Sequence, residues 1–363
     1  MITFDDVIGV IHHKKDHREN GYSIPLAPKF NEKVGNITPG VVTVVGGLPE
    51  AGTTSFVDLN YVMNTLLQWY LLDNRPHLKI MYFSMADGEM KKFQQLLCCY
   101  IRLMHNFSVD IASLNFQSHG KVTNEDDVEK MLECVEESRG FFDEVLSTET
   151  LEIIDGLKSP SDIYNKVTKY MQEIGTDKVG SPYEYDSSLD NPLVLVIVDK
   201  VDFLKPEVDS FSSTVGNDLH MKMSSDMRQL SRRYNISPIL IMSAQIGFSR
   251  NPKDTEPHYR QLGQYGKFCD KGIMLYSPIK EKNTTKFFSN NQEEKLCEYD
   301  GKNVVRWWFI VRNSDGVASS SERMVFLPSS GFMIECPSTE IITSYDELNR
   351  IAVSEPTPYQ EDE

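Results

Sequence analysis

The sequence is short of positive charge and of long apolar runs, and each shortage excludes a class of protein. Lysine and arginine number 37 against 53 aspartates and glutamates, so the formal net charge is −16 over 363 residues. This surplus of acid excludes broad electrostatic adhesion to nucleic acid or anionic membranes, although a few basic loops could still contact DNA. The longest apolar stretch, LVLVIV at 193–198, is far too short to cross a bilayer.

Paired cysteines and a signal peptide are lacking too. The six cysteines, at 98, 99, 134, 269, 297 and 336, form no C-x-x-C pair, which argues against a zinc site and a disulfide framework. The N-terminus, MITFDDVIGVIHHKKDH, has a short apolar run followed by charge, which is not the pattern of a signal peptide. His12 and His13 lack further ligands. Free thiols and these absences predict a cytoplasmic protein.

What is present is a 40% hydrophobic composition and an alternation of strand and helix patterns. Short, continuous β-branched runs indicate strands buried on both faces, and the intervening segments carry apolar residues at helical spacing. Such alternation predicts an α/β fold with a mostly parallel central sheet flanked by helices, and a C-terminal β-hairpin. The expected strands lie at 41–47, 77–85, 151–156, 193–199, 237–245, 271–278 and 305–313, with the hairpin at 323–335.

The pattern predicts one large domain. Residues 1–40 form an N-terminal helix and linker, residues 41–336 form the domain, and 337–363 form a mobile acidic tail. Within the domain, about 103–190 is a largely helical, acidic insertion. One helix in it is well marked, because Ser159 can cap it and Gly175 can end it.

The stretch VVTVVGGLPEAGTTSF, 41–56, runs from a predicted strand through a glycine loop to a predicted helix. It fits the phosphate-loop pattern G-x-x-x-x-G-K-[ST] except that Thr53 holds the lysine position. Such a loop binds phosphate through backbone N–H groups and the helix dipole, although a glycine loop taken alone is also an ordinary turn. The candidate nucleotide-binding residues are Gly47, Pro49, Gly52, Thr53, Thr54 and Ser55.

Two further polar residues follow predicted strands. Asp199 ends the run VIVD, and Gln245 ends SPILIMSAQ. Because ligands of parallel sheets lie at the carboxyl ends of the strands, both are expected near the loop. Thr54 and Asp199 could hold Mg²⁺, the aspartate through water, and Gln245 could sense a γ-phosphate. The expected cofactors are ATP and Mg²⁺.

The motifs occur in an order that resembles the RecA-like motor domain of DnaB-type replicative helicases, most closely the divergent bacteriophage versions. They are GGLPEAGTTSF, IMYFSMADGEM, LVLVIVDKVDFL, MRQLSRRYNISPILIMSAQ, GQYGKFCDKGIMLY and the segment from WFIVRNSDG to GFMI. The resemblance covers about residues 40–335. It implies a RecA-like P-loop NTPase core, a hexameric or mixed ring, single-stranded DNA and other replication proteins as partners, and no membrane.

The resemblance also implies roles for single residues. Asp199 matches the Walker B aspartate, Gln245 the glutamine that couples γ-phosphate to the DNA loops, and Arg312 the arginine finger that reaches a neighbouring subunit. The alternative for Asp199 and Arg312 is a structural role. The family's DNA-facing loops contain Arg250, Arg260 and Lys267 here, for which ordinary solvated charge is the alternative.

Three charged positions of the family pattern are neutral in this sequence. Thr53 replaces the loop lysine, Ala86 the water-activating glutamate, and Ile310 the lysine before the finger. Losing such a charge typically costs on the order of 10²–10³ in rate, and losing a general base roughly 10²–10⁴. Asp87, one residue from Ala86, is a possible substitute for the glutamate.

Three functions follow as hypotheses. The first is a DnaB-like ring subunit in phage DNA replication with impaired or lost ATP hydrolysis, a pseudoenzyme. The second is an active 5′–3′ helicase with an unorthodox site, its lysine supplied by Lys91 or Lys92. The third is a non-enzymatic loader or recombination mediator. Trp307 and Trp308, in RWWF, are explained by a strand beside the core rather than by base stacking.

Overall fold

The computed structural model describes most of the chain from Gly21 to Glu335. The described residues are 21–177, 183–189, 192–209, 212–214, 216–244, 259–277, 305–316, 318, 320–328 and 330–335. His12, His13, Gln245, Arg250, Cys297 and Cys336 lie outside them, as does the predicted tail. Within the described part, no helix is long and apolar enough to cross a membrane.

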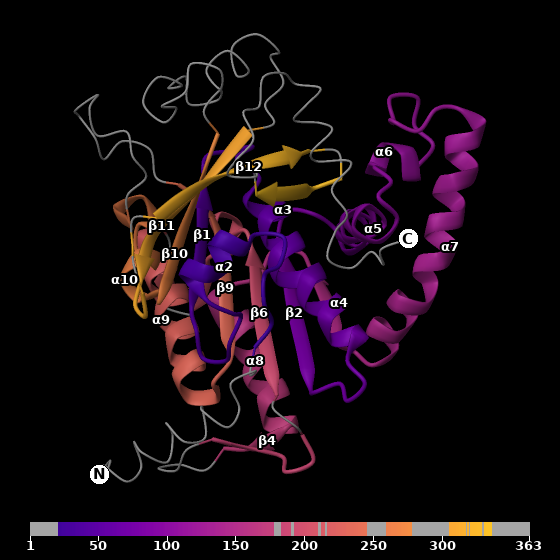
Figure 1. Cartoon of the computed structure of the whole chain (residues 1–363). Helices are drawn as coiled ribbons and strands as arrows, with labels where there is room; N and C mark the ends of the chain where they lie inside the picture. Colours follow the sequence, from indigo (N-terminus) through magenta and orange to yellow (C-terminus); the bar gives the residue numbers. More distant parts are fainter. Residues whose placement is uncertain are drawn as a thin grey trace, which may run out of the picture.

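A nine-stranded sheet forms the centre of the molecule (Figure 1). Its strand order is β13-β12-β11-β10-β1-β9-β6-β2-β3, and the six strands from β10 to β3 are mutually parallel. β11, β12 and β13 extend the sheet in antiparallel fashion. The bounds are β1 Thr43–Gly47, β2 Leu78–Ser84, β3 Leu151–Asp155, β6 Leu193–Asp199, β9 Ser237–Ser243, β10 Lys271–Tyr276, β11 Val305–Asn313, β12 Ser320–Leu327 and β13 Phe332–Glu335.

The parallel strands are buried on both faces, as their continuous apolar runs predict. Along β6, Leu195 and Ile197 pack into the core on one face, and Val194, Val196 and Val198 pack into the core on the other. The alternation follows from the two-residue period of a strand. The predicted α/β fold with a mostly parallel sheet is therefore confirmed.

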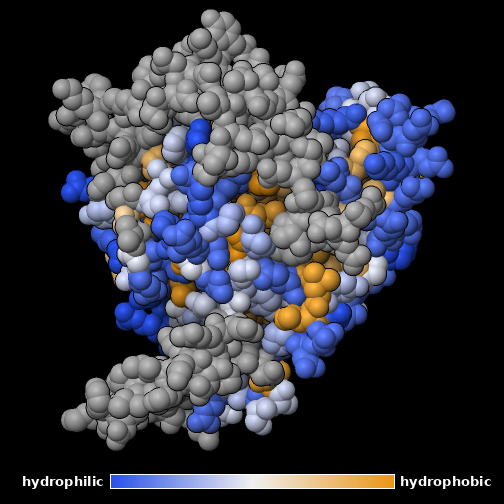
Figure 2. Space-filling model, viewed as in Figure 1, coloured by the Kyte–Doolittle hydropathy of each residue, from blue (hydrophilic) through white to orange (hydrophobic). Residues whose placement is uncertain are grey.

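Helices cover both faces. One face packs against a continuous helix made of α3 (Thr53–Val57), the π-helical η1 (Asp58–Met63) and α4 (Asn64–Leu71), together with α5 (Glu89–His105). The other face packs against α8 (Pro160–Glu173) and α9 (Asn217–Tyr234). The long α7 (Glu125–Ser147) contacts α5, and its outer surface is mostly hydrophilic (Figure 2).

Local sequence signals explain several element ends. The Ser159 side chain accepts from Asp162 N while the Asp162 carboxylate accepts from Ser159 N, the capping box that begins α8. The segment 103–190 is only partly an insertion. Its strand β3 is an edge strand of the central sheet, and its helix α8 covers one face of that sheet. At the start of α5, the Met90 side chain is 71% exposed.

The remaining elements are short. They are α2 (Pro28–Val34), α6 (Ile111–Leu114), α10 (Tyr265–Phe268), η2 (Val201–Phe203), η3 (Tyr259–Leu262) and two small two-stranded sheets, β4 (Gly175–Thr176) with β5 (Glu184–Tyr185) and β7 (Glu207–Asp209) with β8 (Ser212–Thr214). Trp308 of β11 is fully buried in the core, which confirms its structural explanation. The four described cysteines, Cys98, Cys99, Cys134 and Cys269, are buried free thiols.

Candidate nucleotide-binding site

The glycine loop lies where the pattern predicts, between β1 and the helix that starts at Thr53. Gly52 immediately precedes that helix with φ 90° and ψ 24°, a left-handed conformation that glycine adopts without steric cost. The N–H groups of a first helical turn have no partner inside the helix, so they are available to an anion. The backbone of a phosphate loop is therefore present.

A side chain of strand β11 holds the glycine loop in place. Arg306, which is 2% exposed, donates from Nε to the Ala51 carbonyl at 3.0 Å and from Nη2 to the Glu50 carbonyl at 3.0 Å. Its guanidinium also lies over the Phe326 ring, 4.7 Å from the centroid. A fully charged donor on two carbonyls holds the loop in one conformation.

The hairpin of β12 and β13 packs against the same loop. A Cβ at Gly52 would lie 2.3 Å from Met333 Cε and 3.4 Å from the Phe326 ring. Thr53 is 4% exposed, and its methyl carbon would lie 2.9 Å from a Cβ at Gly47. The side chain at the lysine position is thus packed against the loop's own backbone.

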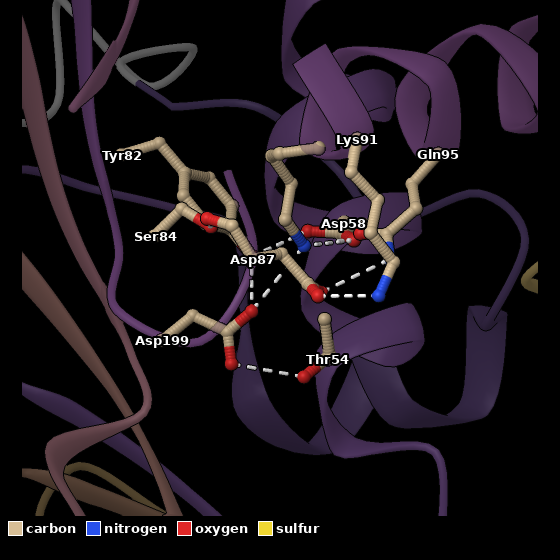
Figure 3. A network of polar contacts seen from close by, with 9 residues as sticks. Thr54, Asp58, Tyr82, Ser84, Asp87, Lys91, Gln95 and Asp199 are labelled. Atoms are coloured by element: carbon tan, nitrogen blue, oxygen red, sulfur yellow. Dashed lines mark hydrogen bonds and ion pairs between the residues drawn. The ribbon is translucent and has the colours of Figure 1, made fainter. Parts of the chain in front are cut away.

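Asp199 lies beside the loop, at the end of β6, as predicted (Figure 3). Thr54 Oγ1 donates to Asp199 Oδ1 at 2.9 Å. Tyr82 Oη, on β2, lies 2.8 Å from Asp199 Oδ2 and 2.8 Å from Asp58 Oδ1. Two carboxylates from different elements therefore share one hydroxyl donor.

A lysine completes this cluster. Lys92, on α5, has no exposed surface, and its Nζ lies 3.0 Å from Asp58 Oδ2 and 3.3 Å from Asp199 Oδ2. Burial acts to lower the pKa of Lys92, but the two carboxylates outweigh it and the pKa is raised. Burial raises the pKa of Asp58, against the opposing effect of Lys92. The ammonium is therefore the charged partner of both aspartates.

This cluster does not fit Mg²⁺ at Thr54 and Asp199. Both oxygens of Asp199 already accept from protein donors, and an ammonium lies where a cation would neutralise the carboxylates. No chemical step is therefore assigned to Mg²⁺ here.

Asp87 is the nearest carboxylate to the position of the missing glutamate. It accepts from Lys91 Nζ at 2.6 Å and from Gln95 Nε2 at 3.2 Å. Burial by itself raises the pKa of Asp87, but these two donors outweigh burial and lower the pKa. A carboxylate with a lowered pKa is a weak general base near neutral pH.

A cavity of about 430 Å³ opens beside these residues, a size typical of small-molecule sites. Two buried polar atoms in its lining, Ser330 Oγ and Gln95 Oε1, have no hydrogen-bond partner among the described residues. Among the described residues of the lining, the charged side chains are three carboxylates and one amine, from Asp58, Asp87, Asp199 and Lys200. The cavity can take a polar ligand, but its own charge disfavours a triphosphate.

Arg312 lies at the opposite edge of the sheet from the loop. It pairs with Gly272, beside the beginning of β1, whereas the loop follows the end of β1. Its Nη1 donates to the Gly266 carbonyl at 2.7 Å, and it lines a basic groove with Lys267. Arg312 therefore cannot act on the loop of its own chain. Arg260 lies nearby in η3 and is exposed.

Sequence reasoning missed Asp58, Tyr82 and Arg306, and named Lys92 only as a possible loop cation. One signal was available. Lys92, Leu96 and Cys99 recur at helical spacing and are buried together, so a lysine occupies the apolar face of α5. A buried lysine requires an acidic partner, but its identity depends on tertiary contacts.

Comparison with known proteins shows similarity at the level of structure alone. No protein-family model matches the sequence, and no curated protein matches it. The solved structure of a DnaB-like replicative helicase, described with its interactions with primase, superposes with a TM-score of 0.62 at 13% identity, over 93% of this chain and 68% of that chain. The ATPase domain of G40P superposes with a TM-score of 0.62 at 14% identity, over 92% of this chain and 99% of that chain.

These similarities agree with the mostly parallel central sheet flanked by helices. At such low identity the similarities establish the architecture alone, and the chemistry of the site depends on the particular residues present. The chain shares its fold with the DnaB-like replicative helicase and with the ATPase domain of G40P.

Proposed function

We propose that this chain is a DnaB-like ring subunit of bacteriophage DNA replication in which ATP hydrolysis is lost or very slow. The observation that carries the proposal is the charge of the loop site. The loop has no lysine of its own, Lys92 is buried against two carboxylates, and the cavity lining is acidic. Phosphoryl transfer depends on positive charge at the phosphates, which this arrangement does not supply.

The two lysines that could replace the missing loop lysine both interact with other groups. Lys91 forms an ion pair with Asp87, and Lys92 has no exposed surface. Neither ammonium lies among the residues that line the cavity. This supports a degraded motor over an active helicase with a relocated lysine.

The site also lacks a general base. Ala86 lines the cavity in place of a glutamate, and Asp87 is held by Lys91 and Gln95 with its pKa lowered. Removing a base costs roughly 10²–10⁴ in rate, in addition to the lost loop charge. ATP binds weakly, held mainly by the backbone N–H groups of the loop.

The proposed partners follow from the ring architecture. Arg312 lies at the edge of the sheet opposite the loop, a position from which it can act on a neighbouring subunit's site. We infer a hexameric ring of this chain alone or mixed with an active subunit. Single-stranded DNA, contacted through Arg250, Arg260 and Lys267, and other replication proteins such as a primase are the further partners.

The test is an ATPase measurement with and without single-stranded DNA. The wild type is compared with Asp199→Asn, which removes the carboxylate at the end of β6, and with Thr53→Lys combined with Ala86→Glu. We expect the wild type and Asp199→Asn to have the same background rate, with no stimulation by DNA. DNA-stimulated turnover in the wild type that Asp199→Asn abolishes would show that the motor is active. Turnover in the double substitution alone would show that the frame is otherwise intact.

A further inference from the structure

The cluster behind the loop contains a cation that the protein itself supplies. Lys92 Nζ bridges carboxylate oxygens of Asp58 and Asp199 at 3.0 and 3.3 Å, and each carboxylate has an oxygen 2.8 Å from Tyr82 Oη (Figure 3). The two aspartates come from η1 and β6, and the lysine comes from α5. Three separate elements therefore meet at one ammonium ion.

The charges show why the ammonium is needed. The side chains of Asp58 and Asp199 are 8% and 7% exposed, and two carboxylates buried this close to each other repel strongly. One Lys92 ammonium reduces the net charge of the trio from −2 to −1. Its burial is complete, so the charge is not shared with solvent. A divalent ion between the two carboxylates would cancel both charges, whereas the ammonium cancels one of them.

The hydrogen-bond donors around Asp199 also argue against a divalent ion at this site. Asp199 Oδ1 accepts from Thr54, and Asp199 Oδ2 accepts from both Tyr82 and Lys92. Thr54 and Asp199 are the two residues that would otherwise hold the metal ion of a phosphate loop. A divalent ion added beside the fixed Lys92 ammonium would be opposed by like-charge repulsion.

We propose that the Lys92 ammonium is a resident cation that takes the place of a divalent metal ion between Asp58 and Asp199, so that this site is independent of divalent metal. The inference goes beyond the proposed function, because a site can lack hydrolysis and still bind metal. It assigns Lys92 a role that a lysine confined to packing would not have: its removal opens a metal site made of two carboxylates and the Thr54 hydroxyl.

The experiment measures Mn²⁺ binding without nucleotide, by electron paramagnetic resonance of the free ion and by thermal unfolding. The variants are Lys92→Met, Lys92→Met combined with Asp58→Asn, and Lys79→Met as a matched control. Lys79 is also buried and is paired with one carboxylate, Glu152, at 3.1 Å, but it lies towards the other end of β2. The double substitution keeps the net charge of the trio at −1.

We expect no Mn²⁺ binding by the wild type at millimolar concentration and none by Lys79→Met. Lys92→Met should bind Mn²⁺ at least about tenfold more tightly than the wild type, since a unit charge adjacent to the site is removed. The added Asp58→Asn should abolish that gain. If Lys92→Met is unfolded in buffer, Mn²⁺ should restore its folded far-ultraviolet dichroism, and Na⁺ at equal ionic strength should not.

Two results would overturn the inference. One is a wild type that binds Mn²⁺ as tightly as Lys92→Met and loses that binding on Asp199→Asn. The other is a Lys92→Met protein, folded or not, on which Mn²⁺ has no effect. Either result leaves the ATPase test of the proposed function unaffected, because that test compares turnover and not metal binding.

Discussion

The contact between the glycine loop and the C-terminal hairpin gives a quantitative prediction for Gly52→Ala. The residue has φ 90°, and an L side chain in the left-handed region costs roughly 1–2 kcal/mol. The new methyl group would meet Met333 Cε, which is the far end of a flexible side chain and can move aside, and it would lie 3.4 Å from the Phe326 ring, so the overpacking cost is at the low end of its range, about 1 kcal/mol. The sum predicts that the free energy of unfolding falls by about 2–3 kcal/mol.

Two comparisons separate these contributions. Gly156 has φ 77°, and no atom of the described residues lies within 4 Å of the place that an added methyl group would take, so Gly156→Ala should show only the backbone cost of roughly 1–2 kcal/mol. Met333→Ala removes the atom that the new methyl group at position 52 would meet, and it costs about 2–5 kcal/mol alone through its cavity. The double substitution at 52 and 333 should therefore cost less than the sum of the single changes, by about 1 kcal/mol.

Equilibrium urea unfolding, followed by fluorescence and circular dichroism, measures these differences. The reasoning fails if Gly52→Ala costs no more than Gly156→Ala and shows no coupling to Met333→Ala. That outcome would mean that the hairpin does not press on the loop in solution.

Two further predictions concern neighbouring groups. Arg306→Met should release the loop, because it removes the donors to the Glu50 and Ala51 carbonyls, and each hydrogen bond to a charged group contributes about 1.5–3 kcal/mol. Backbone hydrogen–deuterium exchange at 48–55 should therefore become faster. Unchanged exchange there would contradict the role of Arg306 in holding the loop. Burial, with a smaller effect of Lys79, lowers the pKa of His77 below its usual 6.5, so His77 stays neutral in the folded chain while the unfolded chain takes up a proton. The stability that His77 contributes is present above about pH 6.5 and is lost as the pH falls through the lowered folded value. The pKa values of His105 and His220 are also lowered, so the urea concentration at the midpoint of unfolding should fall as the pH is lowered from about 7.5 to about 5.5, and it should fall by less in His77→Phe. An equal fall in that variant would rule out the role of His77.

The sequence by itself determined the architecture and the place of the site. Continuous β-branched runs can be satisfied only by strands buried on both faces, and the alternation with helices leaves a parallel sheet as the arrangement. Because the carboxyl ends of parallel strands share one edge, the loop after β1 and Asp199 after β6 were expected to lie together, and Thr54 and Asp199 are hydrogen-bonded. Thr53 and Ala86 already indicated missing charges, since each position is local to one motif.

Only the tertiary structure decided what surrounds those positions. Lys92, Asp58 and Asp199 are far apart in the sequence and meet because α5, η1 and β6 pack against one another. Arg306 reaches the loop for the same reason, from a position 255 residues beyond Ala51. Periodicity states which side of a helix is buried, but the partner of a buried charge is chosen by the packing of other elements, and a single sequence does not contain that choice.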